Sequence, residues 1–215
     1  MSPRPPVRLT LIVCCAPDGG IGAKGGLPWS LPGEMRYFSR VTQHVTPSSD
    51  NQPATANAVI MGRKSWESIP ARFRPLKSRI NVVLSRSDEP LPGINDAKWT
   101  FQATSILDAI KRLHSSDSTG PRCHRIFIIG GAQIYRDALA LDQRSGAWAD
   151  RILLTQIKEP SFECDTHLPD FRNAPGEAWQ QATLAELARW VEVDMPEGDV
   201  EEKDVRYQYQ MWQRS

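Results

Sequence analysis

The sequence predicts an α/β fold with a central mixed, mostly parallel sheet, an antiparallel C-terminal edge and flanking helices. Four short apolar runs rich in β-branched residues each end in a turn or helix signal, which is typical of parallel strands buried on both faces. Helical patterns lie between these runs. The last third instead alternates apolar with other side chains around a Met-Pro-Glu-Gly-Asp turn, which indicates an antiparallel pair.

Strands and helices alternate along most of the chain. The predicted parallel strands are residues 9–16, 58–61, 80–84 and 126–129, and residues 151–157 are a further predicted strand. The predicted helices are residues 35–42, 64–68, 105–113 and 132–139. Ser105 begins the third helix, because Asp108 follows three residues later and the pair resembles an N-cap with an acidic first turn. The predicted antiparallel strands are residues 190–193 and 206–212, separated by residues 195–199.

Length and composition predict one domain spanning residues 1–215. Of the 215 residues, 40% are hydrophobic and 24% are charged, as in ordinary globular proteins. A polar stretch near residues 46–55 has little hydrophobic content, so we expect a solvent-exposed loop insertion there and not a domain boundary.

Charge and cysteine usage argue against several function classes. The net charge of +1 offers no basic face for nucleic acid, and no apolar run approaches the ~20 residues of a membrane span. Cys14, Cys15, Cys123 and Cys164 form no CxxC pair and the four histidines are scattered, so no metal site is expected. We therefore expect reduced thiols in a cytoplasmic protein without a signal peptide or transmembrane segment.

A glycine-rich segment follows the first strand. Gly20, Gly22 and Gly25 match the G-x-G-x-x-G spacing of a dinucleotide fingerprint. A true fingerprint opens a helix, whereas this segment continues into Leu27-Pro28-Trp29, which stops one. The preferred interpretation is a glycine-hinged loop that closes over a site, and a plain surface turn is the simpler alternative.

A carboxylate on an apolar helix face is the second candidate. Glu34 and Phe38 are four residues apart and share a face with Met35 beside them. A carboxylate there is unfavourable unless a polar group meets it, which would suit a ligand. The alternative is a glutamate near a helix N-terminus that faces the macrodipole, a common arrangement.

Three strand ends combine cations, hydroxyls and glycines. Such groups at the C-terminal ends of strands suit a ligand with several phosphates in the crevice of an open α/β sheet. The three segments are Gly62-Arg63-Lys64-Ser65, Ser85-Arg86-Ser87 and Gly130-Gly131-Ala132-Gln133-Ile134-Tyr135.

Taken together, these motifs resemble the dihydrofolate reductase family, in its eukaryotic and fungal-type form. The resemblance covers nearly the whole chain and is carried, in the family's order, by residues 20–22, 27–29, 34–38, 59–66, 74–86, 129–131, 155 and 165–166. Residues 46–55 and 144–148 resemble fungal-type insertions. The resemblance also implies a cis peptide at Gly130-Gly131 and, as a candidate, at Arg74-Pro75.

The resemblance implies NADPH-dependent reduction of 7,8-dihydrofolate to 5,6,7,8-tetrahydrofolate for one-carbon metabolism, and inhibition by antifolates. It assigns catalytic roles to Glu34, Thr155 and Trp29. Glu34 would accept hydrogen bonds from the pterin and raise its proton affinity, so that a water delivers the proton to N5. Thr155 would be the hydroxyl partner of that carboxylate.

The same resemblance assigns the binding residues. Arg79 would pair with the α-carboxylate of the glutamate tail through its forked guanidinium. The full substrate set is Ile12, Val13, Cys14, Met35, Phe38, Ile69, Leu76, Arg79, Ile129 and Tyr135. The full cofactor set is Cys14, Ile21, Gly22, Gly25, Gly26, Leu27, Gly62, Arg63, Lys64, Ser65, Ser85, Arg86, Ser87, Gly130, Gly131, Ala132, Gln133, Ile134 and Tyr135.

Two alternative functions fit the same residues less well. A reductase of the same fold that acts on a pyrimidine precursor of riboflavin would not need Glu34 and Arg79 together. A non-catalytic nucleotide-binding module would not need to retain Glu34, Arg79 and all three phosphate-type segments. We therefore expect an enzyme with dihydrofolate and antifolates as ligands, no nucleic-acid or membrane partner, and a monomeric state.

Overall fold

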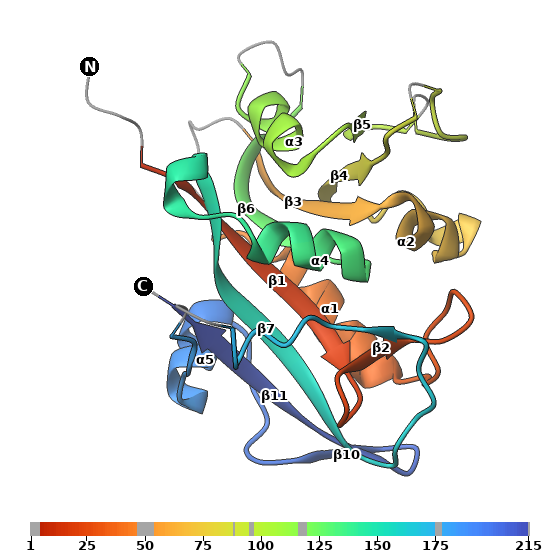
Figure 1. The fold of residues 1–215 in the computed structure, drawn as a ribbon, viewed down its shortest axis with the longest axis vertical. Helices are drawn as coiled ribbons and strands as arrows, with labels where there is room; N and C mark the ends of the chain where they lie inside the picture. The colour runs from red at the N-terminus through yellow and green to blue at the C-terminus, as the bar shows by residue number, and fades with distance from the viewer. Residues whose placement is uncertain are drawn as a thin grey trace.

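The computed structural model describes residues 5–46, 54–87, 89–94, 97–115, 120–174 and 178–214. Apart from its ends, the insertion predicted near residues 46–55 lies outside these ranges. The described residues form a nine-stranded sheet in the order β10-β11-β7-β1-β6-β3-β4-β5, with β9 beside β11, and a separate two-stranded sheet of β2 and β8. Figure 1 shows β1 near the middle, between β6 and β7.

Parallel pairing dominates the sheet, as predicted. The strands from β1 outward along the parallel half are β1 (Val7–Cys15), β6 (Arg122–Ile128), β3 (Thr55–Gly62), β4 (Arg79–Leu84) and β5 (Thr100–Ala103). On the other side of β1 lie β7 (Ala147–Glu159), β11 (Val205–Gln213), β10 (Val200–Glu202) and β9 (Gln180–Gln181). β7 is parallel to β1, whereas β11 is antiparallel to β7, β9 and β10. The predicted antiparallel C-terminal edge is therefore confirmed.

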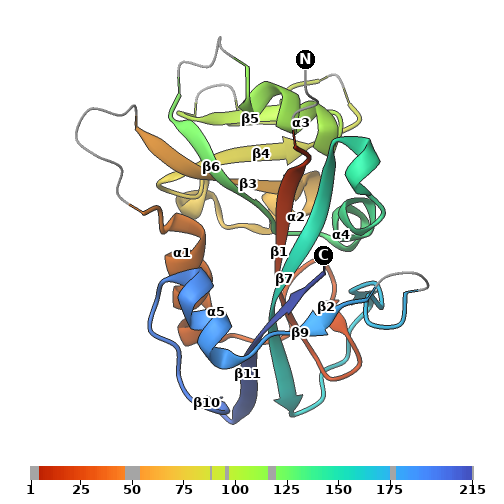
Figure 2. The same cartoon turned by 90° about the vertical axis from the view of Figure 1, so that its left-hand side faces the viewer.

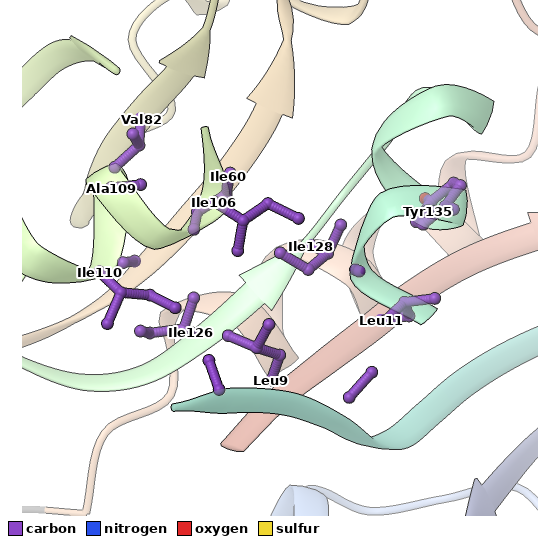
Figure 3. Close-up of a cluster of buried hydrophobic side chains, with 14 of the residues drawn as sticks. Leu9, Leu11, Ile60, Val82, Ile106, Ala109, Ile110, Ile126, Ile128 and Tyr135 are labelled. Atoms are coloured by element: carbon purple, nitrogen blue, oxygen red, sulfur yellow. The ribbon is translucent and has the colours of Figure 1, made fainter. Parts of the chain in front are cut away.

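Both faces of the parallel strands are buried because helices cover them. Figure 2 shows α1 (Pro32–Gln43) and α5 (Leu184–Val191) on one face and α4 (Ala132–Leu139) on the other. On the α4 face, α3 (Ile106–Leu113) adds the apolar side chains that pack over β1, β3 and β6, as Figure 3 shows. Leu9 and Leu11 point to this face, whereas Ile12 belongs to the core beneath α1.

Shorter elements complete the structure. They are α2 (Arg63–Ser68), two 3-10 helices at Ala71–Phe73 and Gln143–Ser145, and the strands β2 (Gly20–Gly22) and β8 (Thr166–His167). The Ser105 side chain accepts a hydrogen bond from the Asp108 amide, so the predicted N-cap is confirmed. Residues 144–148, predicted as an insertion, span the end of a 3-10 helix and the first two residues of β7. No helix within the described ranges is long and apolar enough to cross a membrane.

The strand predicted at residues 190–193 is wrong. Its first two residues instead end α5, which begins with a capping box in which Thr183 and Glu186 satisfy each other's backbone amides. Leu187 and Val191 are four residues apart and both buried, which is helical spacing. The partner of β11 in the C-terminal hairpin is β10, beyond the predicted turn.

Candidate active site

A large cavity opens where the parallel strands end. It has a volume of about 1940 Å³ and is lined by the C-terminal parts of β1, β3 and β4, the loop after β6, and residues of α1, α2 and α4. Open α/β sheets place their ligands at this edge. The cavity is therefore the candidate active site.

The structure brings the predicted binding residues to this one cavity. Every residue of the predicted substrate and cofactor sets lines it, including both glycine-rich segments and all three phosphate-type segments. Among the predicted catalytic residues, Glu34 lines it directly. Thr155 and Trp29 do not line it; Thr155 donates a hydrogen bond to Glu34, and Trp29 lines a smaller cavity that Glu34 also lines.

Glu34 is a buried carboxyl near the start of α1, with 6% of its surface exposed. The Thr155 hydroxyl donates a hydrogen bond of 3.2 Å to its Oε1 atom. Burial raises the pKa of Glu34 to about 7, the Thr155 hydrogen bond opposes that rise, and the nearby charge of Glu202 adds to it. A carboxyl that titrates near neutrality can hold or release a proton near pH 7.

Trp29 lies beside a second, smaller cavity of about 210 Å³, which Glu34 also lines. Its Nε1 atom is buried and has no hydrogen-bond partner among the described residues. A buried indole N–H normally finds a partner, and this cavity has room for water. Trp29 and Glu34 therefore flank a place where a water could reach the carboxyl.

Arg79 is a buried cation at the other end of the cavity, with 5% exposure. Its Nε atom donates to the Lys77 carbonyl at 3.0 Å and its Nη1 atom donates to the Thr42 hydroxyl at 2.8 Å. Burial lowers the pKa of Arg79 to about 10. No carboxylate in the described part of the chain forms a salt bridge with it. A buried guanidinium held from one side suits an anionic ligand group on the other.

Two of the three phosphate-type segments meet where β3 and β6 end. The Gly62 amide donates to the Gly130 carbonyl at 2.8 Å, and the Gly130-Gly131 peptide is cis, as is Arg74-Pro75. Gly130 has a φ of +123°, and a Cβ there would approach the Ser65 hydroxyl to 3.4 Å. Gly131 caps α4 without a side-chain acceptor, and the first residues of that helix, Ala132 and Gln133, line the cavity. Such amides bind phosphate oxygens well.

The glycine segment after β1 forms β2 and a turn instead of opening a helix, so the dinucleotide-fingerprint interpretation does not hold. The Lys24 amide donates to the Asp165 carboxylate at 2.7 Å, and the Asp165 amide donates to the Gly22 carbonyl at 3.0 Å. These contacts hold the segment over the cavity.

Comparison with known proteins decides which family this site belongs to. The family model described as dihydrofolate reductase matches residues 8–214.

The chain belongs to the dihydrofolate reductase family.

Individual dihydrofolate reductases are similar over the same span. The enzyme of Cryptococcus neoformans var. neoformans is 43% identical, covering 95% of this chain and 93% of that protein. The enzyme of Pneumocystis carinii is 40% identical, covering 96% of both proteins. The solved structure of Schistosoma mansoni dihydrofolate reductase has a TM-score of 0.73 at 30% identity, covering 96% of this chain and 98% of that one.

This chain is therefore a dihydrofolate reductase, an oxidoreductase that uses NADPH to reduce dihydrofolate. The cavity suits such a cofactor because glycines leave room for close approach to the backbone. A Cβ on Gly62 would come within 3.2 Å of Ile134, in addition to the contact described for Gly130. Arg63, Lys64 and Arg86 line the same region with positive charge.

Sequence reasoning missed several lining residues of this dihydrofolate reductase. Ser39 and Gln43 lie four and eight residues after Met35 on α1, so helical spacing could have found them. Arg72 and Phe73 come from a 3-10 helix that no periodicity indicated. Cys14 was in both predicted sets, and it is partly buried and lines the cavity, whereas the neighbouring Cys15 is buried.

Proposed function

We propose that Glu34 orients the pterin of dihydrofolate and raises its proton affinity, and that a water hands the proton to N5. The observation that carries this proposal is a buried carboxyl that lines both cavities and accepts a hydrogen bond from Thr155. When bound, NADPH supplies the hydride that C6 receives. The protein's own task is then to orient the substrate, exclude water and provide one proton.

Glu34 suits the pterin contact because Thr155 engages only one of its oxygens. The other oxygen is left to accept hydrogen bonds from the amino and ring N–H groups of the pterin. Burial favours the protonated form of Glu34 up to about pH 7. The Glu34–pterin pair therefore retains a proton at a pH where a glutamate in water would have lost it. Trp29 and the small cavity supply the place for the delivering water.

The apolar walls and Arg79 suit the remainder of the substrate. Met35, Phe38, Ile69 and Leu76 line the cavity between Glu34 and Arg79. We assign them to the aminobenzoyl ring and assign Arg79 to the α-carboxylate of the glutamate tail. Met35 is 48% exposed, so this wall has a flexible side chain at its rim. Ile12, Val13 and Cys14 would meet the pterin, together with Ile129 and Tyr135.

The cofactor would lie along the glycine-rich half of the cavity. We assign the diphosphate to the α4 N-terminus and to Arg63, Lys64 and Ser65, and the 2′-phosphate to Ser85, Arg86 and Ser87. The nicotinamide would lie near the segment containing Ile21, Gly22 and Leu27.

We further propose that residues 1–215 act as one monomeric domain, that antifolates occupy the substrate half, and that nucleic acid is not a ligand.

The proton assignment is tested with Glu34→Gln. This variant keeps the hydrogen bond from Thr155 but cannot hold the proton, so kcat should fall by about 100-fold or more at pH 8 and recover as the pH falls. The rate of NADPH oxidation with dihydrofolate, measured with and without an antifolate, gives kcat. NADPH affinity, measured by fluorescence titration, should stay within about twofold of the wild type, since Glu34 lies outside the proposed cofactor half. A near-wild-type kcat at pH 8 would contradict the assignment.

A further inference from the structure

The helix that carries Glu34 begins without a cap of its own. Leu31 is the N-cap residue of α1 and offers no side-chain acceptor, and Pro32 has no amide proton. Gly33 therefore has the first backbone N–H of this helix that needs a partner. An uncapped helix end would leave the residue beside Glu34 poorly held.

A distant carboxylate supplies that partner. Glu202, the last residue of β10, accepts the Gly33 N–H at both oxygens, at 2.7 Å for Oε1 and 3.0 Å for Oε2. The Tyr207 hydroxyl on β11 donates to Oε2 at 3.2 Å. Two residues with positive φ, Lys203 and Asp204, form the tight turn that pairs Glu202 with the start of β11. The hairpin thus places the carboxylate at a fixed point over the first turn of α1.

The absence of a side chain at position 33 is required for this contact. A Cβ on Gly33 would lie 2.7 Å from Oε2 of Glu202, closer than such atoms approach, and 3.2 Å from its Cδ atom, so a larger residue would force the carboxylate away from this position. The contact is also adjacent to the catalytic carboxyl, because Gly33 and Glu34 share a peptide bond. Glu202 therefore fixes the backbone immediately before Glu34.

Glu202 is also an acidic neighbour of Glu34. Besides Glu202 on β10, the titratable groups whose charges interact with Glu34 come from β1, α1, α4 and β11, and they are Cys14, Tyr37, Tyr135, Tyr207 and Tyr209. Within the described part of the chain this set contains no lysine, arginine or histidine. Burial raises the pKa of Cys14 well above its usual value, and burial likewise raises the pKa of each of the four tyrosines, so these groups stay neutral near pH 7. Glu202 thus provides the charge that disfavours ionisation of Glu34.

We propose that Glu202 is a positioning residue for the reaction, which holds the Gly33–Glu34 peptide from the C-terminal hairpin and places a carboxylate charge beside the first turn of α1. This inference rests on the role proposed above for Glu34. It assigns two effects to one side chain, a geometric effect through the Gly33 amide and an electrostatic effect through its charge. The two effects can be separated by mutation.

The test compares the pH profile of hydride transfer in Glu202→Gln, Glu202→Asp and the wild type, with Glu201→Gln as the matched control. Glu201 lies on the same strand, carries the same charge and is exposed. Glu202→Gln keeps an acceptor for the Gly33 amide but removes the negative charge. The inflection in the plot of hydride-transfer rate against pH should therefore move down by about half a pH unit. Above the inflection this means a rate about threefold lower, with an unchanged rate at low pH. Glu202→Asp keeps the charge but not the reach, so its rate should fall at all pH values.

Each outcome decides a separate point. If Glu34→Gln retains the wild-type inflection, the role proposed for Glu34 fails. If Glu34→Gln loses the inflection but Glu202→Gln matches Glu201→Gln in its profile, the inference about Glu202 fails. A uniform loss of rate in Glu202→Gln without a shift would show a structural contact only and would also overturn the inference. Thermal unfolding of each variant at pH 6 shows whether the variant folds. If Glu202→Gln does not fold, Glu202→Asp still tests the geometric effect.

Discussion

The Tyr135 hydroxyl donates a 2.8 Å hydrogen bond to the carbonyl of Ile12, joining α4 to β1 at the floor of the cavity. Tyr135 and Ile12 were both predicted to bind ligands. In the structure the Tyr135 hydroxyl holds the backbone of Ile12. Tyr135 is 3% exposed, and its ring lies beside Gly130. Its hydroxyl proton therefore holds the wall against which the two ligands would meet and is not available to donate to them.

Tyr135→Phe should lower the free energy of unfolding by about 1 kcal/mol, because a buried carbonyl loses its donor. For a chain of this size that corresponds to a fall in Tm of about 2–4 °C. Tyr37→Phe is the matched control, since the Tyr37 hydroxyl is buried but has no hydrogen-bond partner among the described residues. The control should be as stable as the wild type, and equal losses in the two variants would argue against a structural role for the Tyr135 hydrogen bond.

The pKa of Glu34 predicts a pH-dependent change in stability. The pKa is raised to about 7 in the folded protein, against 4.5 for an ordinary glutamate, so this group's stabilisation is complete below about pH 4.5 and is lost as the pH rises through 7. Glu34→Gln has no carboxyl to ionise, so this loss of stability with rising pH should be absent from the variant. The variant should match the wild type near pH 4.5 and exceed it by about 1–3 kcal/mol near pH 8.

Urea unfolding at both pH values measures this difference. Glu201→Gln, at an exposed position, is the control and should show no such dependence. A wild type that is more stable than Glu34→Gln at pH 8 would mean that the buried carboxylate has charged partners which this structure does not contain.

Arg79→Leu should weaken folate and glutamate-bearing antifolates by about 30-fold or more, because the buried partner of their carboxylate is lost. Antifolates without that tail should lose little affinity. Arg72→Leu is the control, since Arg72 lines the cavity but stacks on Phe73, with its guanidinium 4.8 Å from the ring centre. Titration of the two ligand classes against both variants gives the affinities, and equal losses for both classes would refute the tail assignment.

Much of the fold could be predicted because burial leaves a pattern in the sequence. β1, β4 and β6 are continuous apolar runs, and their prediction was confirmed within a few residues. The strand at residues 190–193 was wrong because Leu187 and Val191 fit a helix only when the capping residues before them are considered. β5 was missed because its residues are mostly half-buried and mixed in polarity.

The site could be predicted residue by residue only through resemblance. Spacing placed Glu34 and Phe38 on one helix face but could not distinguish a helix-end acid from a catalytic one. The feature that distinguishes the two kinds of acid is the hydrogen bond from Thr155, which lies 121 positions further along the chain than Glu34. The contact of Glu202 with Gly33 spans 169 positions and left no local pattern at all. Such contacts are set by strand order, which local periodicity does not encode.

The role proposed for Arg79 would link the substrate to the lifetime of the protein. A buried cation without a carboxylate partner in the described residues makes folding less favourable, and a bound folate carboxylate would provide its counter-ion. A ligand that binds only the folded state lowers the population of unfolded chains, which are the form that proteases degrade. If Arg79 binds the folate carboxylate as proposed, we expect cells short of folate to degrade this enzyme faster and hold less of it, even with its synthesis unchanged.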